Sequence, residues 1–211
     1  KPAFWLLAFG AAASSMMGYG LIFWMPSYFM RSLGLSLIET TWFYGTLGLI
    51  GGMIGIWMGG VLGDRLGPRD RSAYARIPAI AFALSVPFYV VGLSLSWLPG
   101  VFVALMIPTA LGLVWLGPVI AAVQGMVPPA MRATASAIFL LVNNLIGIGG
   151  GTLFLGRLSD LFAARFGDDS LKYAIFAGLP LYLVAALLML LASRRLVRDW
   201  PAAAAPSPAG A

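Results

Sequence analysis

Long apolar runs dominate the sequence and limit what the chain can fold into. Each run is about as long as the roughly 20 residues that a helix needs to cross the hydrocarbon core of a bilayer. Membrane barrel strands are shorter, about 10 residues, and alternate between two faces, a pattern that is absent here. Because lipid offers the backbone no hydrogen-bond partners, runs of this length must be helical. The sequence predicts six spans, at about 3–30, 40–62, 77–95, 101–127, 134–160 and 173–192.

The charge content supports the same fold class. Of the 211 residues, 61% are hydrophobic and 9% are charged, whereas soluble domains have about 25% charged residues. So few charges cannot cover a surface that faces water. We therefore expect an all-α integral membrane bundle of six helices, spanning about residues 1–200, in contact with membrane lipids. Residues 201–211 are mostly Ala, Pro and Gly and are expected to be a disordered tail.

The start of the chain is not expected to be a cleavable signal. The first apolar run begins almost at Lys1 and is too long, and too rich in glycine and aromatic residues, for a signal peptide. We interpret the start as a truncation or an internal boundary of a longer protein.

The cationic residues set the expected orientation. With six spans, both termini lie on one side, and that side holds nine Lys and Arg residues against four on the other. The positive-inside rule then places both termini in the cytoplasm, and we expect the bacterial inner membrane as the location. The net charge of +6 comes from cations between apolar runs. They form no basic stripe of the kind that binds nucleic acid.

Residue types that the chain lacks exclude several chemistries. It contains no Cys and no His, so disulfides, thiolate chemistry and the commonest metal ligand and general base are absent. We expect no metal, no cofactor and no catalytic residue.

A short sequence repeat relates the two halves of the chain. Gly60-Val-Leu-Gly-Asp64-Arg-Leu66 recurs as Gly156-Arg-Leu-Ser-Asp160-Leu-Phe162. Each copy closes the second helix of a group of three, and the two groups insert with opposite orientation. This arrangement predicts a three-plus-three inverted repeat, which transporters use to build two related gates.

The first copy continues into a basic loop, Gly67-Pro-Arg69-Asp-Arg71. The whole stretch resembles the loop signature of the major facilitator superfamily, between the second and third helices of each half. The resemblance implies one six-helix half, which we take as the C-terminal half, working by alternating access with an N-terminal six-helix half. It implies a conformational latch in which an acid caps a helix or pairs with an arginine and lets go when the halves rock. The expected latch residues are Gly60, Asp64, Arg65, Gly67, Arg69, Arg71, Arg132, Arg157 and Asp160.

A narrower resemblance rests on three motifs. They are Pro128-Pro-Ala-Met-Arg132-Ala-Thr-Ala-Ser-Ala137, Asn144-Leu-Ile-Gly-Ile-Gly-Gly-Gly151 and Gly156-Arg-Leu-Ser-Asp160. Together they are similar to the spinster-like branch, which includes lipid and sphingolipid-phosphate exporters and uncharacterised bacterial members. The resemblance implies a lipid-like, amphipathic or other small-molecule substrate.

Polar and aromatic residues inside the spans are the candidates for a substrate cavity. Intramembrane polar groups face the bundle interior, but they also serve as hydrogen-bonded contacts between helices. Adjacent helical positions point about 100 degrees apart, so at most one of two neighbouring asparagines is expected to face a given cavity squarely. The candidates are Tyr19, Phe23, Trp115, Phe139, Asn143 and Asn144.

No Asp, Glu, Lys or Arg lies near the centre of a predicted span. If transport is coupled to protons, the titrating group is expected in the other half; facilitated diffusion is the alternative. Two rival functions stay open: an intramembrane enzyme that acts on lipid, and a channel or structural membrane subunit. The enzyme lacks the paired intramembrane carboxylates it would need, and the channel lacks a continuous polar helix face.

Overall fold

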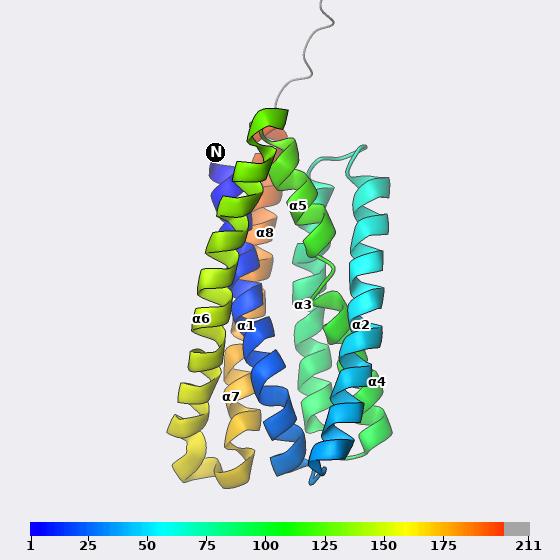
Figure 1. Cartoon of the computed structure of the whole chain (residues 1–211), viewed down its shortest axis with the longest axis vertical. Helices are drawn as coiled ribbons and strands as arrows, with labels where there is room; N and C mark the ends of the chain where they lie inside the picture. Colours follow the sequence, from blue (N-terminus) through cyan, green and yellow to red (C-terminus); the bar gives the residue numbers. More distant parts are fainter. Residues whose placement is uncertain (201–211) are drawn as a thin grey trace, which may run out of the picture.

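The computed structural model describes residues 1–200 as an elongated bundle of α-helices (Figure 1). The predicted tail, 201–211, lies outside the described residues. Two short 3-10 turns, Pro129–Met131 and Gly167–Asp169, precede α6 and α7. The helices are α1 (Pro2–Ser32), α2 (Leu37–Leu66), α3 (Ala73–Ser94), α4 (Leu98–Leu111), α5 (Leu116–Gly125), α6 (Arg132–Phe166), α7 (Ser170–Gly178) and α8 (Pro180–Asp199).

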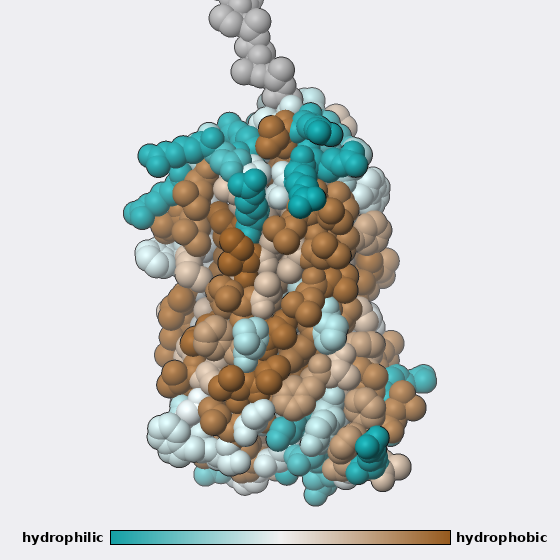
Figure 2. Space-filling model, turned by 180° about the vertical axis from the view of Figure 1, so that it is seen from behind, coloured by the Kyte–Doolittle hydropathy of each residue, from teal (hydrophilic) through white to brown (hydrophobic). Residues whose placement is uncertain are grey.

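Polar residues gather at the two ends of the bundle. Figure 2 shows hydrophilic side chains at both ends and a hydrophobic band between them. The start of α1, the α2–α3 loop, the start of α6 and the end of α8 share one end, which we call the basic end (Figure 1). The nine cations expected on one side of the membrane belong to these segments.

Fewer segments of the described chain qualify as membrane spans than the six that the sequence predicts. By length and hydropathy, five segments of the described chain can cross a membrane, because Pro129–Asp199 counts as a single helical segment of 71 residues. The helices α6 and α7 count as one segment because the turn after α6 is short. Gly167 in this turn adopts a φ of 54°. α6 runs away from the basic end, and α7 and α8 run back towards it (Figure 1).

The fourth apolar run is broken into α4 and α5. The break spans residues 112–115, near mid-height of the bundle (Figure 1). Pro118 has no amide proton, so the carbonyl of Val114 lacks its helical partner. That carbonyl is turned towards α2, where a Cβ on Gly59 would overlap it. The break therefore belongs to a close helix contact.

Glycines form two close helix contacts. In α2, Gly51, Gly55, Gly59 and Gly63 are buried at intervals of four and face α4 and α5. In α6, Gly147 and Gly151 face α1 in the same way. A Cβ on Gly55 or Gly151 would lie closer than 3.0 Å to a backbone carbonyl of the opposite helix, Ala110 or Met16. Only glycine permits this approach.

An aromatic stack connects three helices at the basic end. The Trp200 ring stacks on Tyr74, with centroids 5.8 Å apart, and the Arg71 guanidinium lies 4.6 Å from the Trp200 centroid. Trp200 also packs against Gly125, where a Cβ would overlap its ring. The end of α8 therefore holds the start of α3 against the end of α5.

We expect Trp200→Ala to lower the free energy of unfolding by about 2 kcal/mol, through lost ring burial, stacking and cation–π contact. Thermal unfolding in detergent measures the loss. Trp97→Ala is the matched control, because Trp97 is 70% exposed and its removal should change little. Equal effects of the two substitutions would contradict a structural role for the stack.

Candidate functional site

A cavity of about 350 Å³ lies between α1, the α4–α5 break and α6. We call it the asparagine cavity. The break contributes Gly112, Leu113 and Trp115, so the missing helical turn helps to open the space. No Asp, Glu, Lys or Arg is among its lining residues in the described chain. The lining residues are Ser14, Ser15, Gly18, Tyr19, Ile22, Gly112, Leu113, Trp115, Leu116, Leu140, Asn143 and Asn144.

Two hydrogen bonds connect α1 to α6 across this cavity. The Ser15 hydroxyl donates to Asn143 Oδ1 at 2.8 Å, and the Tyr19 hydroxyl donates to Asn144 Oδ1 at 3.1 Å. Asn143 is 3% exposed, and Asn144 is partly exposed. Both carbonyl oxygens are thereby engaged. Asn143 Nδ2 also donates to Asn144 Oδ1 at 3.5 Å, near the limit for a hydrogen bond, so the other amide N–H groups are the natural donors to a bound molecule. Both asparagines are among the lining residues, and of the two only Asn144 is partly exposed, so the expectation that at most one faces the cavity squarely stays a prediction.

The six predicted cavity residues divide into two groups. Tyr19, Trp115, Asn143 and Asn144 line the asparagine cavity. Phe139 is fully buried behind it, with its ring centroid 6.2 Å from that of Trp115, and supports the wall. Phe23 is 61% exposed on α1, packs edge-on against Trp24 and does not line the cavity of the described chain.

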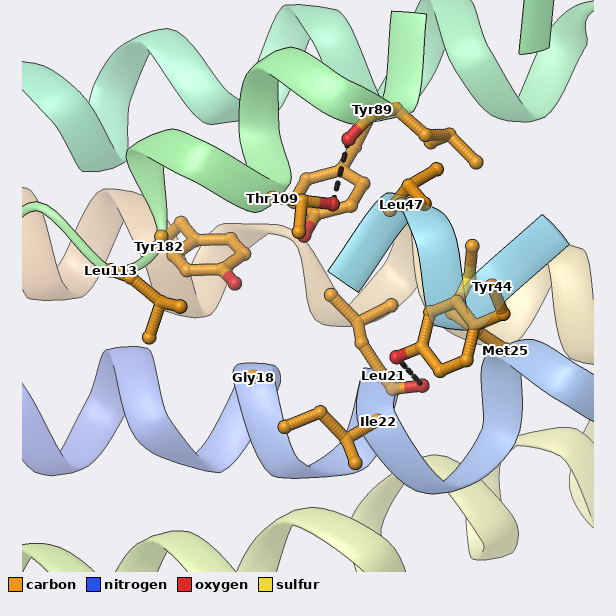
Figure 3. Close-up of a pocket in the computed structure, with 12 residues that line it drawn as sticks. Gly18, Leu21, Ile22, Met25, Tyr44, Leu47, Tyr89, Thr109, Leu113 and Tyr182 are labelled. Atoms are coloured by element: carbon orange, nitrogen blue, oxygen red, sulfur yellow. Dashed lines mark hydrogen bonds between the residues drawn. The ribbon is translucent and has the colours of Figure 1, made fainter. Parts of the chain in front are cut away.

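A second, smaller cavity of about 110 Å³ adjoins the first. We call it the tyrosine pocket, after Tyr44 of α2, Tyr89 of α3 and Tyr182 of α8. Figure 3 shows Tyr44 and Tyr182 with their hydroxyl groups directed into the space opposite Gly18. Sequence reasoning missed these tyrosines. They lie in three different apolar runs, and nothing in the spacing of the runs brings them together.

The predicted latch residues are mostly exposed. Asp64, Arg65, Arg69, Arg132, Arg157 and Asp160 all face outward. The one ion pair among residues 1–200 joins Asp70 to Arg76 instead. Asp64 and Asp160 are thus free to meet groups outside this bundle.

The remaining latch residues take part in local contacts. Gly67 lies against the Tyr74 ring, where a Cβ would overlap it, so glycine is required at this turn. Arg71 donates to the Gly67 carbonyl at 3.5 Å and contacts Trp200. Gly60 has open space at its Cβ position, although the backbone of Gly117 lies nearby.

Asp70 organises the basic loop. Its carboxylate accepts hydrogen bonds from the Ser72 hydroxyl at 2.6 Å and the Ser72 amide at 2.9 Å, and pairs with Arg76 at 3.0 Å. The bonds from Ser72, aided by the Arg76 charge, lower the pKa of Asp70. This acid was not among the predicted site residues, and Asp-x-Ser before a helix is the local signal for it.

The lowered pKa of Asp70 predicts a pH-dependent contribution to stability. Because the folded pKa lies below the unfolded one, the stabilisation is present at neutral pH and is lost as the pH falls through the lowered value. Asp70→Asn should lower the melting temperature at pH 7. The difference from wild type should shrink below about pH 4. A difference that stays constant from pH 7 to pH 3 would contradict this role.

The described residues contain no cluster that suits a metal ion: no three His, Cys, Asp or Glu side chains come together among them. The arrangement is a bundle of membrane helices around an uncharged, hydrogen-bonding cavity, with charged groups confined to its ends. This organisation is typical of a membrane transport protein.

Comparison with known families identifies the group. The Major Facilitator Superfamily matches residues 1–151, so the chain belongs to that superfamily, a family of transporters and not of enzymes.

Individual relatives agree with this assignment. The chain is similar to an MFS-type efflux pump of Mycolicibacterium smegmatis, 34% identical over 200 residues that make up 94% of this chain and 46% of that protein. It is also similar to protein spinster homolog 1 of Xenopus laevis, 27% identical over 76% of this chain and 33% of that protein. The chain thus spans less than half the length of these relatives.

Solved structures give the same result. A bacterial homolog of the human lysosomal transporter Spinster has been crystallised in an inward-facing, unoccupied conformation and in an inward-facing, occupied one. The chain matches them with TM-scores of 0.89 and 0.86, in each case at 26% identity over 97% of its length. It covers 50% and 51% of those chains. The fold is therefore half of a major facilitator fold.

Proposed function

We propose that this chain is the C-terminal half of a transporter that works by alternating access together with a second six-helix half. The observation that carries the proposal is the uncharged asparagine cavity, bordered by the broken α4–α5 helix near mid-height. Irregular backbone at membrane depth is tolerated where it lines a cavity, and transporters place their substrate sites at such discontinuous helices.

Six membrane crossings are proposed, although only five segments of the described chain qualify as spans by length. A helix rises about 1.5 Å per residue, so the 71 residues of Pro129–Asp199 are far too long for one crossing. The reversal between α6 and α7 supports two (Figure 1).

The six crossings form two inverted groups of three in this proposal. Gly51 and Gly55 of α2 lie 96 positions before Gly147 and Gly151 of α6, the same offset as between Asp64 and Asp160. The contacts correspond as well. Gly51 faces Thr109 as Gly147 faces Ser15, and Gly55 faces the Ala110 carbonyl as Gly151 faces that of Met16. Ser15 and Thr109 lie 94 positions apart, and so do Met16 and Ala110. Two helix pairs with matching contacts support an inverted repeat.

The exposed acids would act between the two halves. With the basic end in the cytoplasm, Asp64 and its arginines form the cytoplasmic latch, and Asp160 with Arg157 forms the opposite one. Their exposure in this half supports partners in the other half, because a latch must be released when the halves rock.

The substrate is proposed to be an amphipathic or lipid-like small molecule that is moved out of the cell or membrane. The similarity to an efflux pump and to spinster proteins supports this class. The cavity supplies amide and hydroxyl groups beside apolar walls, and no charge to bind an ionic headgroup. Any coupling proton would therefore titrate in the other half.

The test is transport by the full-length protein in proteoliposomes, with three fluorescent amphiphiles: neutral Nile red, cationic ethidium and an anionic NBD-labelled fatty acid. Saturable movement of at least one is expected, with the neutral dye favoured by this half. Chemical conversion of the dye without movement would support an enzyme. Linear, unsaturable flux that persists in Asp64→Ala would support a channel. Either result would overturn the proposal.

A further inference from the structure

The tyrosine pocket and the asparagine cavity occupy corresponding positions in the bundle. A residue of α1 corresponds to the residue of α4–α5 that lies 94 positions later, and a residue of α2 corresponds to the residue of α6 that lies 96 positions later. By this correspondence, eight of the twelve residues that line the asparagine cavity match residues that line the tyrosine pocket. Gly18 corresponds to Gly112, and both glycines line both cavities. The matching residues of the tyrosine pocket are Gly18, Leu21, Ile22, Tyr44, Leu47, Thr109, Gly112 and Leu113.

The chemistry of the two cavities differs at the corresponding positions. Asn143 corresponds to Leu47, and Leu140 corresponds to Tyr44. The polar side chain of the tyrosine pocket therefore lies one turn away from the position that Asn143 has in the asparagine cavity. The tyrosine pocket also gains Tyr89 and Tyr182, whose rings stack with centroids 5.8 Å apart and planes 10° apart. These two tyrosines occupy α3 and α8, the third helices of the two groups. The result is a mostly apolar pocket with phenol groups on one side.

The hydrogen bonding of Tyr44 leaves room for a ligand. Its hydroxyl donates to the Leu21 carbonyl at 3.5 Å, near the limit for a hydrogen bond. A ligand oxygen at normal distance would compete with that contact at little cost. The walls are Leu21, Met25, Leu47 and Leu105. A dry cavity of about 150 Å³ takes up benzene, so a pocket of about 110 Å³ suits a group no larger than one such ring.

We propose that the tyrosine pocket is a second ligand subsite. It binds a neutral apolar group of up to ring size that carries one hydrogen-bonding oxygen, with Tyr44 as the donor. Gly18 and Gly112 form the passage between this subsite and the asparagine cavity. The subsite deepens the proposed transport function and rests on it: one amphipathic molecule places its polar part at Asn143 and Asn144 and its apolar end among the tyrosines.

Gly18 offers a clean way to fill the pocket. A Cβ at Gly18 meets nothing within 4 Å, so Gly18→Leu can begin a side chain in the shared passage, in a helix that favours Leu over Gly. Gly48→Leu is the matched control, because Gly48 also has open space at its Cβ and lines neither cavity.

The experiment is photolabelling of the full-length protein, in nanodiscs of palmitoyl-oleoyl phosphatidylcholine, with 4-azidobenzyl alcohol, a neutral ring with one hydroxyl. The ring fills the pocket, and the azide, which exceeds the volume of the pocket, extends into the passage at Gly18 and Gly112. Labelled residues are identified by peptide mass spectrometry. We expect saturable labelling at Tyr44, Tyr89 or Tyr182, competed by benzyl alcohol. Gly18→Leu should reduce it at least tenfold, and Gly48→Leu should leave it unchanged.

Three outcomes would overturn the subsite. They are labelling that does not saturate, labelling equally strong at the exposed Trp42 and Trp57, and labelling of the tyrosines that Gly18→Leu does not reduce. If Gly18→Leu fails to fold, Tyr44→Phe with benzyl alcohol competition tests the same site: it should weaken competition severalfold, and no change would overturn the proposal. The transport assay is separate. Transport without pocket labelling defeats only the subsite, and pocket labelling without transport defeats only the transport function.

Discussion

Gly55→Ala should lower the melting temperature strongly, although it adds only one methyl group. The new Cβ would lie closer than 3.0 Å to the Ala110 carbonyl, and a backbone oxygen of a packed helix cannot move aside as a flexible side chain can. Relief requires α2 and α4 to separate along the whole glycine contact. Overpacking usually costs about 1–3 kcal/mol, and this contact, where backbone meets backbone, should reach about 3 kcal/mol. Thermal unfolding in detergent should show a fall in melting temperature of about 10 °C.

Gly48→Ala is the control in the same helix. A Cβ at Gly48 meets nothing within 4 Å, so this substitution should be neutral, or stabilising by up to about 1 kcal/mol through helix propensity. Gly151→Ala in α6 should behave like Gly55→Ala, because it faces the Met16 carbonyl in the same way. If the Gly55→Ala and Gly48→Ala proteins have the same melting temperature, the close contact between α2 and α4 does not exist.

Asn143→Leu should lower transport at least tenfold while the protein stays folded. The leucine fills a similar volume and matches Leu47, the residue at the corresponding place in the tyrosine pocket. It removes the amide donor from the asparagine cavity and leaves the Ser15 hydroxyl without its acceptor. A lost hydrogen bond to bound substrate is worth about 1.5 kcal/mol, which is about tenfold in affinity. Initial rates in proteoliposomes, at saturating and at low dye concentration, measure the loss.

Leu145→Asn provides a contrast for this prediction. Leu145 is 71% exposed on the same helix and lies outside the asparagine cavity. An equal loss from both substitutions would mean that Asn143 supports α6 generally and does not bind substrate.

Much of the fold follows from the sequence because lipid leaves the backbone few choices. Long apolar runs must be helices, and short loops between them bring successive helices side by side. The sequence could not place the break at residues 112–115, since Pro108 and Pro118 both indicate a kink in that run, and its position depends on packing against Gly59. The sequence predicts separate spans at 134–160 and 173–192, whereas in the structure the turn between α6 and α7 is only three residues long, so Pro129–Asp199 counts as one segment by length.

The candidate site was predictable where polar residues stand out against an apolar background. Asn143, Asn144 and Tyr19 are noticeable for that reason, and they line the cavity. The tyrosine pocket escaped because tyrosines are common in membrane helices, and their convergence is a matter of helix packing. Phe23 shares a helix face with Tyr19, four positions away, which favours a cavity role, but in the structure its side chain is 61% exposed and does not line the asparagine cavity. In the loop after α2, the sequence predicts a latch role for Asp64 and none for the neighbouring Asp70, whose contacts with Ser72 and Arg76 hold the loop.

Alternating access is tested most directly by the accessibility of one thiol. This chain has no cysteine, so Gly18→Cys, placed where the two cavities meet, is the only thiol of the full-length protein once any cysteine of the other half has been replaced by serine. A membrane-impermeant maleimide should label it in both right-side-out and inside-out vesicles. Adding Asp64→Ala should change the two labelling rates in opposite directions, because weakening one latch favours one conformation at the expense of the other. Rates that rise or fall together, or a thiol that cannot be reached from either side, would contradict the account.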